Sequence, residues 1–208
     1  MPTEMSQEQW PPPDCPPLVW PTLPDQAARL AWYRAVIKAY SLLWEGHALQ
    51  PRLLPVPEHA LSELEARLGC PLPAPLRSYH NELGALSLRE RLCSVDDGDL
   101  PIQPLPDAYP GIFDLTEDET DLALAGDLIA FGDYLGNGNM FCFHRRTAEV
   151  FYFDHDNSPM LSRFFLSTEQ YLDALMLRCL TAVYEDDEAG EAILVEVFGQ
   201  TLVRKWLY

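Results

Sequence analysis

Basic residues are scarce in this chain and unevenly placed. Its 208 residues include 14 Lys and Arg against 32 Asp and Glu, so the formal net charge is −18 at pH 7. No Lys or Arg occurs between Arg91 and Arg145. The same interval holds the acidic residues Asp96, Asp97, Asp99, Asp107, Asp114, Glu117, Asp118, Glu119, Asp121, Asp127 and Asp133. Such a surface repels phosphate backbones, so the composition argues against direct nucleic-acid binding.

Two interpretations of this acidity stay open. The charges can simply keep the surface well solvated. They can also attract a basic protein partner and raise its association rate by ~10–1,000-fold at low salt. For the second case, the candidate contacts are Asp96, Asp97, Asp99, Asp118 and Glu119.

The sequence also lacks long apolar runs and clustered cysteines. No apolar stretch approaches the roughly 18 residues that span a bilayer. Residues 1–10 include acids and no basic residue, unlike a secretory signal. We therefore expect a cytoplasmic protein without a membrane partner. The five cysteines are widely spaced and form no C-x-x-C, so neither a disulfide scaffold nor a four-thiolate zinc site is expected.

What the sequence does contain is a run of three short apolar segments in its middle, at 128–131, 140–143 and 150–153. Their aromatic and β-branched residues favour strands. Gly136-Asn137-Gly138-Asn139 separates the first two, and both residue types tolerate the positive φ of a tight turn. Strands joined by short connections predict an antiparallel meander over about 128–153.

Helices are predicted on both sides of the meander, from apolar residues at spacings of three and four and from capping residues. Residues 96–110 are predicted to form a long acidic loop, and Leu86, Leu88 and Leu92 a strand. The predicted helices cover 25–44 after Asp25, 58–68 before Gly69, 74–82, a short helix from Thr116-x-x-Glu119, another from Ser167-x-x-Gln170, and 189–206. Together these elements predict an α+β fold in which helices pack against an antiparallel sheet.

Proline content marks off the N-terminal region. Residues 1–24 are proline-rich and are predicted to form a tail or strap. Residues 25–57 are predicted to be an added helix and connector that form one globular unit with an α+β domain at 58–208.

Asp154-His155-Asp156 is the one group with the residue types of a metal or acid/base site. In an extended segment, however, Asp154 and Asp156 point to one face and His155 to the other. A strand-end turn closed by side-chain hydrogen bonds is the structural alternative. No second ligand cluster, nucleophile elbow or phosphate loop occurs, so we predict no catalytic residue, metal or cofactor.

Four segments resemble, in order, motifs of the SUKH superfamily of bacterial immunity proteins. They are LEARLGCPLPAPLRSY at 64–79, IAFGD to GNGN to FCF at 129–143, VFYFDHD at 150–156, and the capped helix within 164–175. The resemblance covers roughly 58–182. Asn81-Glu82-Leu83-Gly84 departs from the family's asparagine-glycine pair. The helix at 25–44 and the proline-rich tail have no counterpart.

The resemblance implies an α+β fold and a non-catalytic protein that binds and neutralises a cognate toxin in bacterial competition. The acidic surface suggests a toxin with a basic surface, such as a nuclease. Two alternatives stay open: a regulatory or scaffold protein that docks through its proline tail, and a metal-dependent hydrolase that uses Asp154, His155 and Asp156.

The predicted recognition positions are residues expected to be exposed on loops at one end of the sheet, because loops on a rigid scaffold often carry binding. These are Asp133, Tyr134, Asn137, Asn139, Asp154 and Asp156. Turn formation alone is the alternative role for each.

Overall fold

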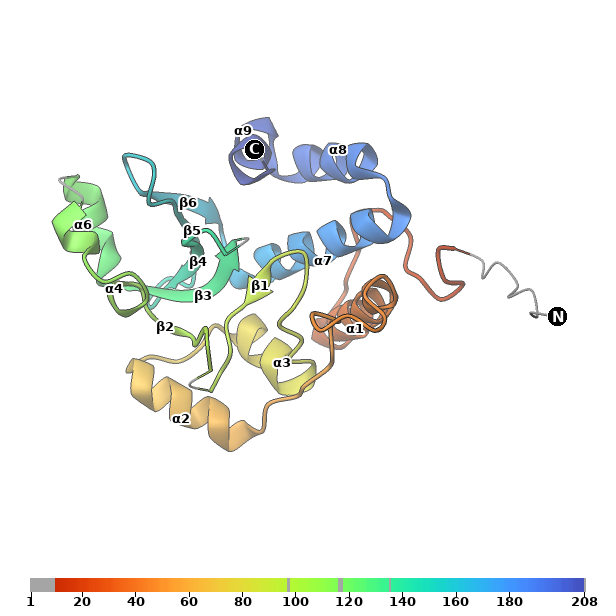
Figure 1. Ribbon diagram of the computed structural model, residues 1–208, viewed down its shortest axis with the longest axis horizontal. Helices are drawn as coiled ribbons and strands as arrows, with labels where there is room; N and C mark the ends of the chain where they lie inside the picture. Colours follow the sequence, from red (N-terminus) through yellow and green to blue (C-terminus); the bar gives the residue numbers. More distant parts are fainter. Residues whose placement is uncertain (1–9, 97, 116–117, 135, 208) are drawn as a thin grey trace. The chain divides into compact units, whose positions relative to one another are not determined.

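A computed structural model describes residues 10–96, 98–115, 118–134 and 136–207, with Tyr134 described by its backbone alone (Figure 1). The chain divides into two compact units. One unit runs from Arg52 to Leu175, and the other combines the residues up to Pro51 with those from Met176 onward. The helix α7 (Thr168–Tyr184) begins in the first unit and ends in the second. Of the described helices, none has both the length and the apolar character needed to cross a membrane.

An antiparallel sheet forms the centre of the unit 52–175. Its described strands are β1 (Arg91–Leu92), β2 (Gln103–Pro104), β3 (Leu128–Tyr134), β4 (Asn139–His144), β5 (Val150–Phe153) and β6 (Leu161–Phe165). The order is β1-β3-β4-β5-β6, and β2 also pairs with β3. The predicted meander is therefore confirmed as β3, β4 and β5. The strand β6, which pairs with β5, was not predicted, because LSRFF lacks a regular apolar–polar alternation.

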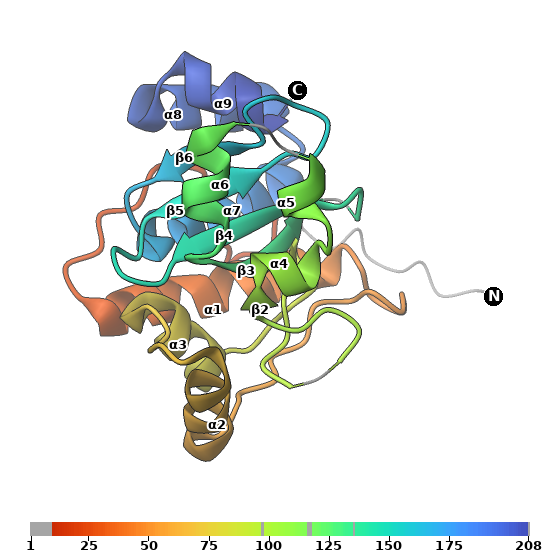
Figure 2. The ribbon, with the colours of Figure 1, turned by 90° about the vertical axis from the view of Figure 1, so that its left-hand side faces the viewer.

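Both faces of the sheet are covered, which explains why every residue of β4 and β5 is buried. On one face, Met140, Cys142 and Phe153 join a cluster that includes Leu105, Ile112 and Ala125. These last three come from α4 (Leu105–Ala108), α5 (Ile112–Leu115) and α6 (Glu119–Ala125), which lie in front of the sheet in Figure 2.

The opposite face is aromatic and is covered by the first turns of α7. Tyr171 packs with its ring centroid 4.7 Å from that of Phe141 and 5.1 Å from that of Phe131. Ser167 caps α7 as predicted, because its hydroxyl accepts from the Gln170 N–H at 3.3 Å. The confirmed architecture is α+β, with helices on an antiparallel sheet.

Two helices before the sheet have the predicted boundaries. α2 (Glu58–Leu68) buries Leu61, Leu64 and Leu68 and ends at Gly69, whose φ is +67°. α3 (Ala74–Glu82) has a proline in its first turn and buries Leu76 and Tyr79.

Three local predictions between α3 and β3 were wrong or incomplete. The loop predicted over 96–110 contains β2 and α4. The strand predicted from Leu86 to Leu92 is reduced to Arg91–Leu92. Asp118, rather than Thr116, caps the described part of α6 by accepting from the Thr120 N–H at 2.8 Å, and Thr116 itself lies outside the described residues.

The regular elements described in the other unit are all helices. α1 (Gln26–Leu42) begins after Asp25, whose carboxylate accepts from the Ala28 N–H at 2.8 Å, as predicted. The single helix predicted over 189–206 is wrong, because the chain breaks at Gly199 (φ +83°) into α8 (Asp187–Phe198) and α9 (Gln200–Leu207). The Trp10 indole N–H donates to the Val183 carbonyl at 2.7 Å, and Trp20 packs edge-on against Phe198.

Candidate functional site

Most of the predicted recognition positions gather at one end of the sheet. Strand register brings them together, because Tyr134 pairs with Asn139, and Met140 pairs with Phe153. The β3–β4 turn and the β5–β6 loop therefore lie at the same end. Asn137 and Asp156 are exposed there, whereas Asp133 and Asp154 are half-buried. The side chain of Tyr134 lies outside the described residues.

Asn139 does not have the exposed position that was expected. It is buried, and its side-chain amide N–H donates to the Tyr152 hydroxyl at 3.0 Å. Its side-chain oxygen accepts from the His155 N–H at 3.3 Å and lies 2.8 Å from His155 Nδ1. Asn139 thus joins the two loops from a buried position beneath them.

The carboxylates of these loops close turns. Asp133 accepts from the Gly136 N–H at 3.2 Å, and burial raises the pKa of the Asp133 carboxyl group. Asp154 accepts from the Asp156 N–H at 3.2 Å and from the Asn157 amide. In the described part of the chain, no three His, Cys, Asp or Glu side chains are grouped to hold a metal. The arrangement matches a turn closed by side-chain hydrogen bonds.

The start of α6, with Asp118 and Glu119, lies beside the end of the β5–β6 loop. Asp121, one turn into α6, is fully buried and accepts from the N–H groups of Met160 and Leu161 at 2.8 and 3.0 Å. This carboxylate fastens α6 to the start of β6. Glu119 is exposed and Asp118 half-buried, so both can contribute negative charge at this end of the domain.

Some acidic residues of the interval 92–144 add no net negative charge to the surface. Asp121 is internal, and Asp127 forms ion pairs with Arg145 and Arg146. The interval 92–144 contains no Lys or Arg, but in the folded chain the two arginines of the β4–β5 turn lie next to Asp127. Net negative charge on the surface therefore rests on fewer residues than the sequence suggested.

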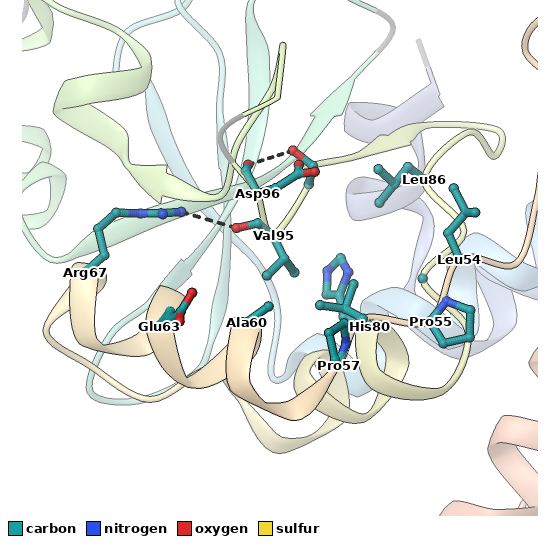
Figure 3. Close-up of a pocket in the computed structure, with 13 residues that line it drawn as sticks. Leu54, Pro55, Pro57, Ala60, Glu63, Arg67, His80, Leu86, Val95 and Asp96 are labelled. Carbon is teal, nitrogen blue, oxygen red and sulfur yellow. Dashed lines mark hydrogen bonds between the residues drawn. The ribbon is translucent and has the colours of Figure 1, made fainter.

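Asp96 and Asp99 lie elsewhere, in the exposed β1–β2 loop, and Asp97 is outside the described residues. The loop lies against α2, because Arg67 donates to the Val95 carbonyl at 3.2 Å. Asp96 there borders a pocket of about 440 Å³, which we call the His80 pocket (Figure 3). Its lining comes from the connector 54–57, α2, the end of α3 and the segment 94–96.

His80 is the fully buried polar residue among those that line this pocket (Figure 3). The side chain is fully buried, and neither ring nitrogen has a hydrogen-bond partner among the described residues. Burial lowers the pKa of His80 to about 4, so the ring is neutral at pH 7. This pocket was not predicted from the sequence. The one available signal was a histidine beside Tyr79 on the apolar side of a helix.

Comparison with known families identifies the sheet-containing unit. The family model for the SMI1 / KNR4 family (SUKH-1) matches residues 55–174, more than half of the chain. The chain belongs to the SUKH-1 family. The match nearly coincides with the unit 52–175 and includes both the sheet end and the His80 pocket. No curated protein and no solved structure matches the sequence.

Proposed function

We propose that this SUKH-1 protein is a non-catalytic immunity protein that binds and neutralises a cognate bacterial toxin with a basic surface. The observation that carries the proposal is the location of the acidic loops on the SUKH-1 domain itself. Asp156 and Glu119 are exposed at the sheet end, and Asp96 and Asp99 are exposed in the β1–β2 loop. The rigid sheet beneath the sheet-end loops holds them in place for recognition.

The mechanism follows from charge and geometry. A toxin that cleaves nucleic acid needs a basic cleft to attract phosphate. Carboxylates on the immunity protein are attracted to that cleft, which accelerates association and directs binding to the toxin's active surface. Bound there, the domain excludes the substrate without performing chemistry of its own.

Co-expression tests this proposal directly. The toxin encoded beside this gene is expressed with and without the protein, and growth and complex formation are measured. We expect growth to be restored and the two proteins to co-purify, while a toxin from an unrelated locus is not neutralised. If the neighbouring toxin remains lethal and no complex forms, the proposal fails.

The scaffold alternative has less support from the described tail. Trp10 and Trp20 hold residues 10–24 against helices of their own unit, and the Tyr184 hydroxyl donates to the Pro16 carbonyl at 3.1 Å. A strap engaged in this way is a poor free ligand for a proline-binding module. Deleting residues 1–24 should therefore leave toxin binding intact.

A further inference from the structure

The His80 pocket combines apolar walls, charged residues at its border and one buried ring that has no hydrogen-bond partner among the described residues. Leu54, Val56, Leu86 and Val95 contribute to its walls, and the His80 imidazole points into it from α3 (Figure 3). A neutral imidazole carries one N–H donor and one nitrogen acceptor. A buried polar group without a partner costs about 1–3 kcal/mol, so the ring favours any occupant that supplies a hydrogen bond.

The wall formed by the connector is fixed in place. The N–H groups of Leu54 and Val56 donate to the carbonyls of Leu83 and His80 at 2.8 and 2.9 Å. Gly84 has a φ of +62°, and a Cβ at this residue would lie 1.9 Å from the Leu54 carbonyl oxygen. The close approach of these two segments leaves no room for the wall to move inward. The apolar walls are thus formed before binding, which keeps the entropy cost of filling them small. The His80 ring nitrogens are themselves covered, so a hydroxyl reaches them only when the side chains over the ring move aside.

The mouth of the pocket resembles the centre of a protein interface. Leu53 and Leu54 remain 36% and 59% exposed beside it, although both are large apolar side chains. The carboxylates of Glu63 and Asp96 stand at the border of the pocket. Apolar residues surrounded by charged ones are typical of the spots that dominate binding energy.

We propose that the His80 pocket receives a tyrosine side chain of the protein partner, with its ring between the apolar walls and its hydroxyl hydrogen-bonded to the His80 imidazole. A phenol hydroxyl both donates and accepts, so it satisfies either ring nitrogen. A leucine would fill the space but leave the imidazole unpaired. The partner's identity as a toxin rests on the proposed function; the pocket's preference for a phenol does not.

The first experiment uses p-cresol as a probe of the free, full-length protein. The ¹⁵N signals of the His80 ring are followed by NMR during titration and assigned by their loss in His80→Phe. We expect p-cresol to shift these signals saturably and toluene, which has no hydroxyl, to bind about tenfold more weakly. Equal binding of the two probes, or a His80 ring that p-cresol does not affect, would overturn the proposal.

The second experiment uses a matched pair on α2. Ala60 lines the pocket, whereas Ala66 is exposed on the same helix and does not. We expect Ala60→Trp to fill the pocket, abolish p-cresol binding and weaken the complex with the cognate toxin at least tenfold. Ala66→Trp should change neither.

The two experiments separate the pocket from the proposed function. If Ala60→Trp abolishes p-cresol binding and leaves toxin affinity unchanged, the pocket takes a small phenol rather than a partner's side chain, and the proposal is wrong. If co-expression shows no toxin neutralised, the immunity function fails, and with it a toxin as the source of the tyrosine. The p-cresol titration still decides whether the pocket recognises a phenol.

Discussion

His80 and Asp121 are two polar side chains that folding removes completely from water, with opposite results. Asp121 accepts hydrogen bonds from two backbone N–H groups, so its carboxylate and the N–H groups at the start of β6 all have partners. His80 receives none from the described residues and loses its charge instead. A buried group that is satisfied stabilises the fold, whereas one that is left unpaired is available for recognition.

The lowered pKa of His80 predicts a loss of stability in mild acid. The folded state keeps His80 neutral down to a pKa of about 4, whereas the unfolded chain binds a proton near pH 6.5. As the pH falls through this window, the proton favours the unfolded state. We expect His80 to remove about 2 kcal/mol from the free energy of unfolding between pH 7.5 and 5. Urea unfolding at both pH values should show a smaller decrease for His80→Phe than for the natural chain. An equal decrease in the two proteins would contradict the assignment.

Replacing Asp121 should destabilise the domain strongly. Asp121→Ala leaves the Met160 and Leu161 N–H groups buried without their acceptor, which should cost about 2–4 kcal/mol in chemical denaturation. Asp114, exposed on α5, is the matched control, and Asp114→Ala should change stability by less than about 0.5 kcal/mol. Similar effects of the two substitutions would mean that the link between α6 and β6 contributes little.

At the scale of elements, sequence patterns predicted correctly those helix ends and turns that depend on interactions between neighbouring residues. α2 ends at Gly69 because the residue there adopts the left-handed conformation, which glycine favours. The β3–β4 turn forms where Gly136 and Gly138 adopt positive φ. β6 and α4 were missed because their existence depends on partners far away in sequence. β6 is completed by pairing with β5 and by the Asp121 carboxylate, and neither is visible in the residues 161–165 themselves.

Gly→Ala substitutions at Gly69 and Gly84 separate the cost of a strained backbone from the cost of a steric clash. Both have φ near +65°, but an added Cβ meets nothing within 4 Å at Gly69 and meets the Leu54 carbonyl at Gly84. We expect Gly69→Ala to cost about 1–2 kcal/mol from the left-handed conformation alone. Gly84→Ala should cost a further ~1–3 kcal/mol and weaken p-cresol binding, because the connector must move. Chemical denaturation and the p-cresol titration measure both effects. Equal costs at the two positions would show that the connector yields freely.

At the scale of the molecule, the proposed function requires that the location of the acidic residues, and not their number alone, selects the contacting surface. The net charge of −18 includes a second acidic run, Glu185–Glu188, outside the SUKH-1 match. If binding depended only on total charge, that run would serve as well as the sheet end. If binding depends on the SUKH-1 surface, the sheet end contributes to the association rate and the run 185–188 does not.

Two double variants with equal net charge test this difference. Asp156→Asn with Glu119→Gln neutralises the sheet end, and Glu185→Gln with Glu188→Gln neutralises the other run. We expect the first pair to slow association with the toxin roughly tenfold at low salt and to weaken its salt dependence. The second pair should leave the rate within about twofold. Association kinetics at several salt concentrations measure this, and the reverse order would place the interface outside the sheet end.

The sequence by itself determined the α+β class, the meander, α2 and α3, the acidic character and the family motifs, because periodicity, turn residues and charge act over a few neighbours. Only the tertiary structure decided which polar groups are buried. Asn139 became a link between loops, Asp121 an internal acceptor, and Asp127 the partner of two arginines. It also assembled the pocket, since His80 meets residues near 54 and 95 only after folding. Burial and pairing depend on contacts between distant residues, and a local pattern does not specify them.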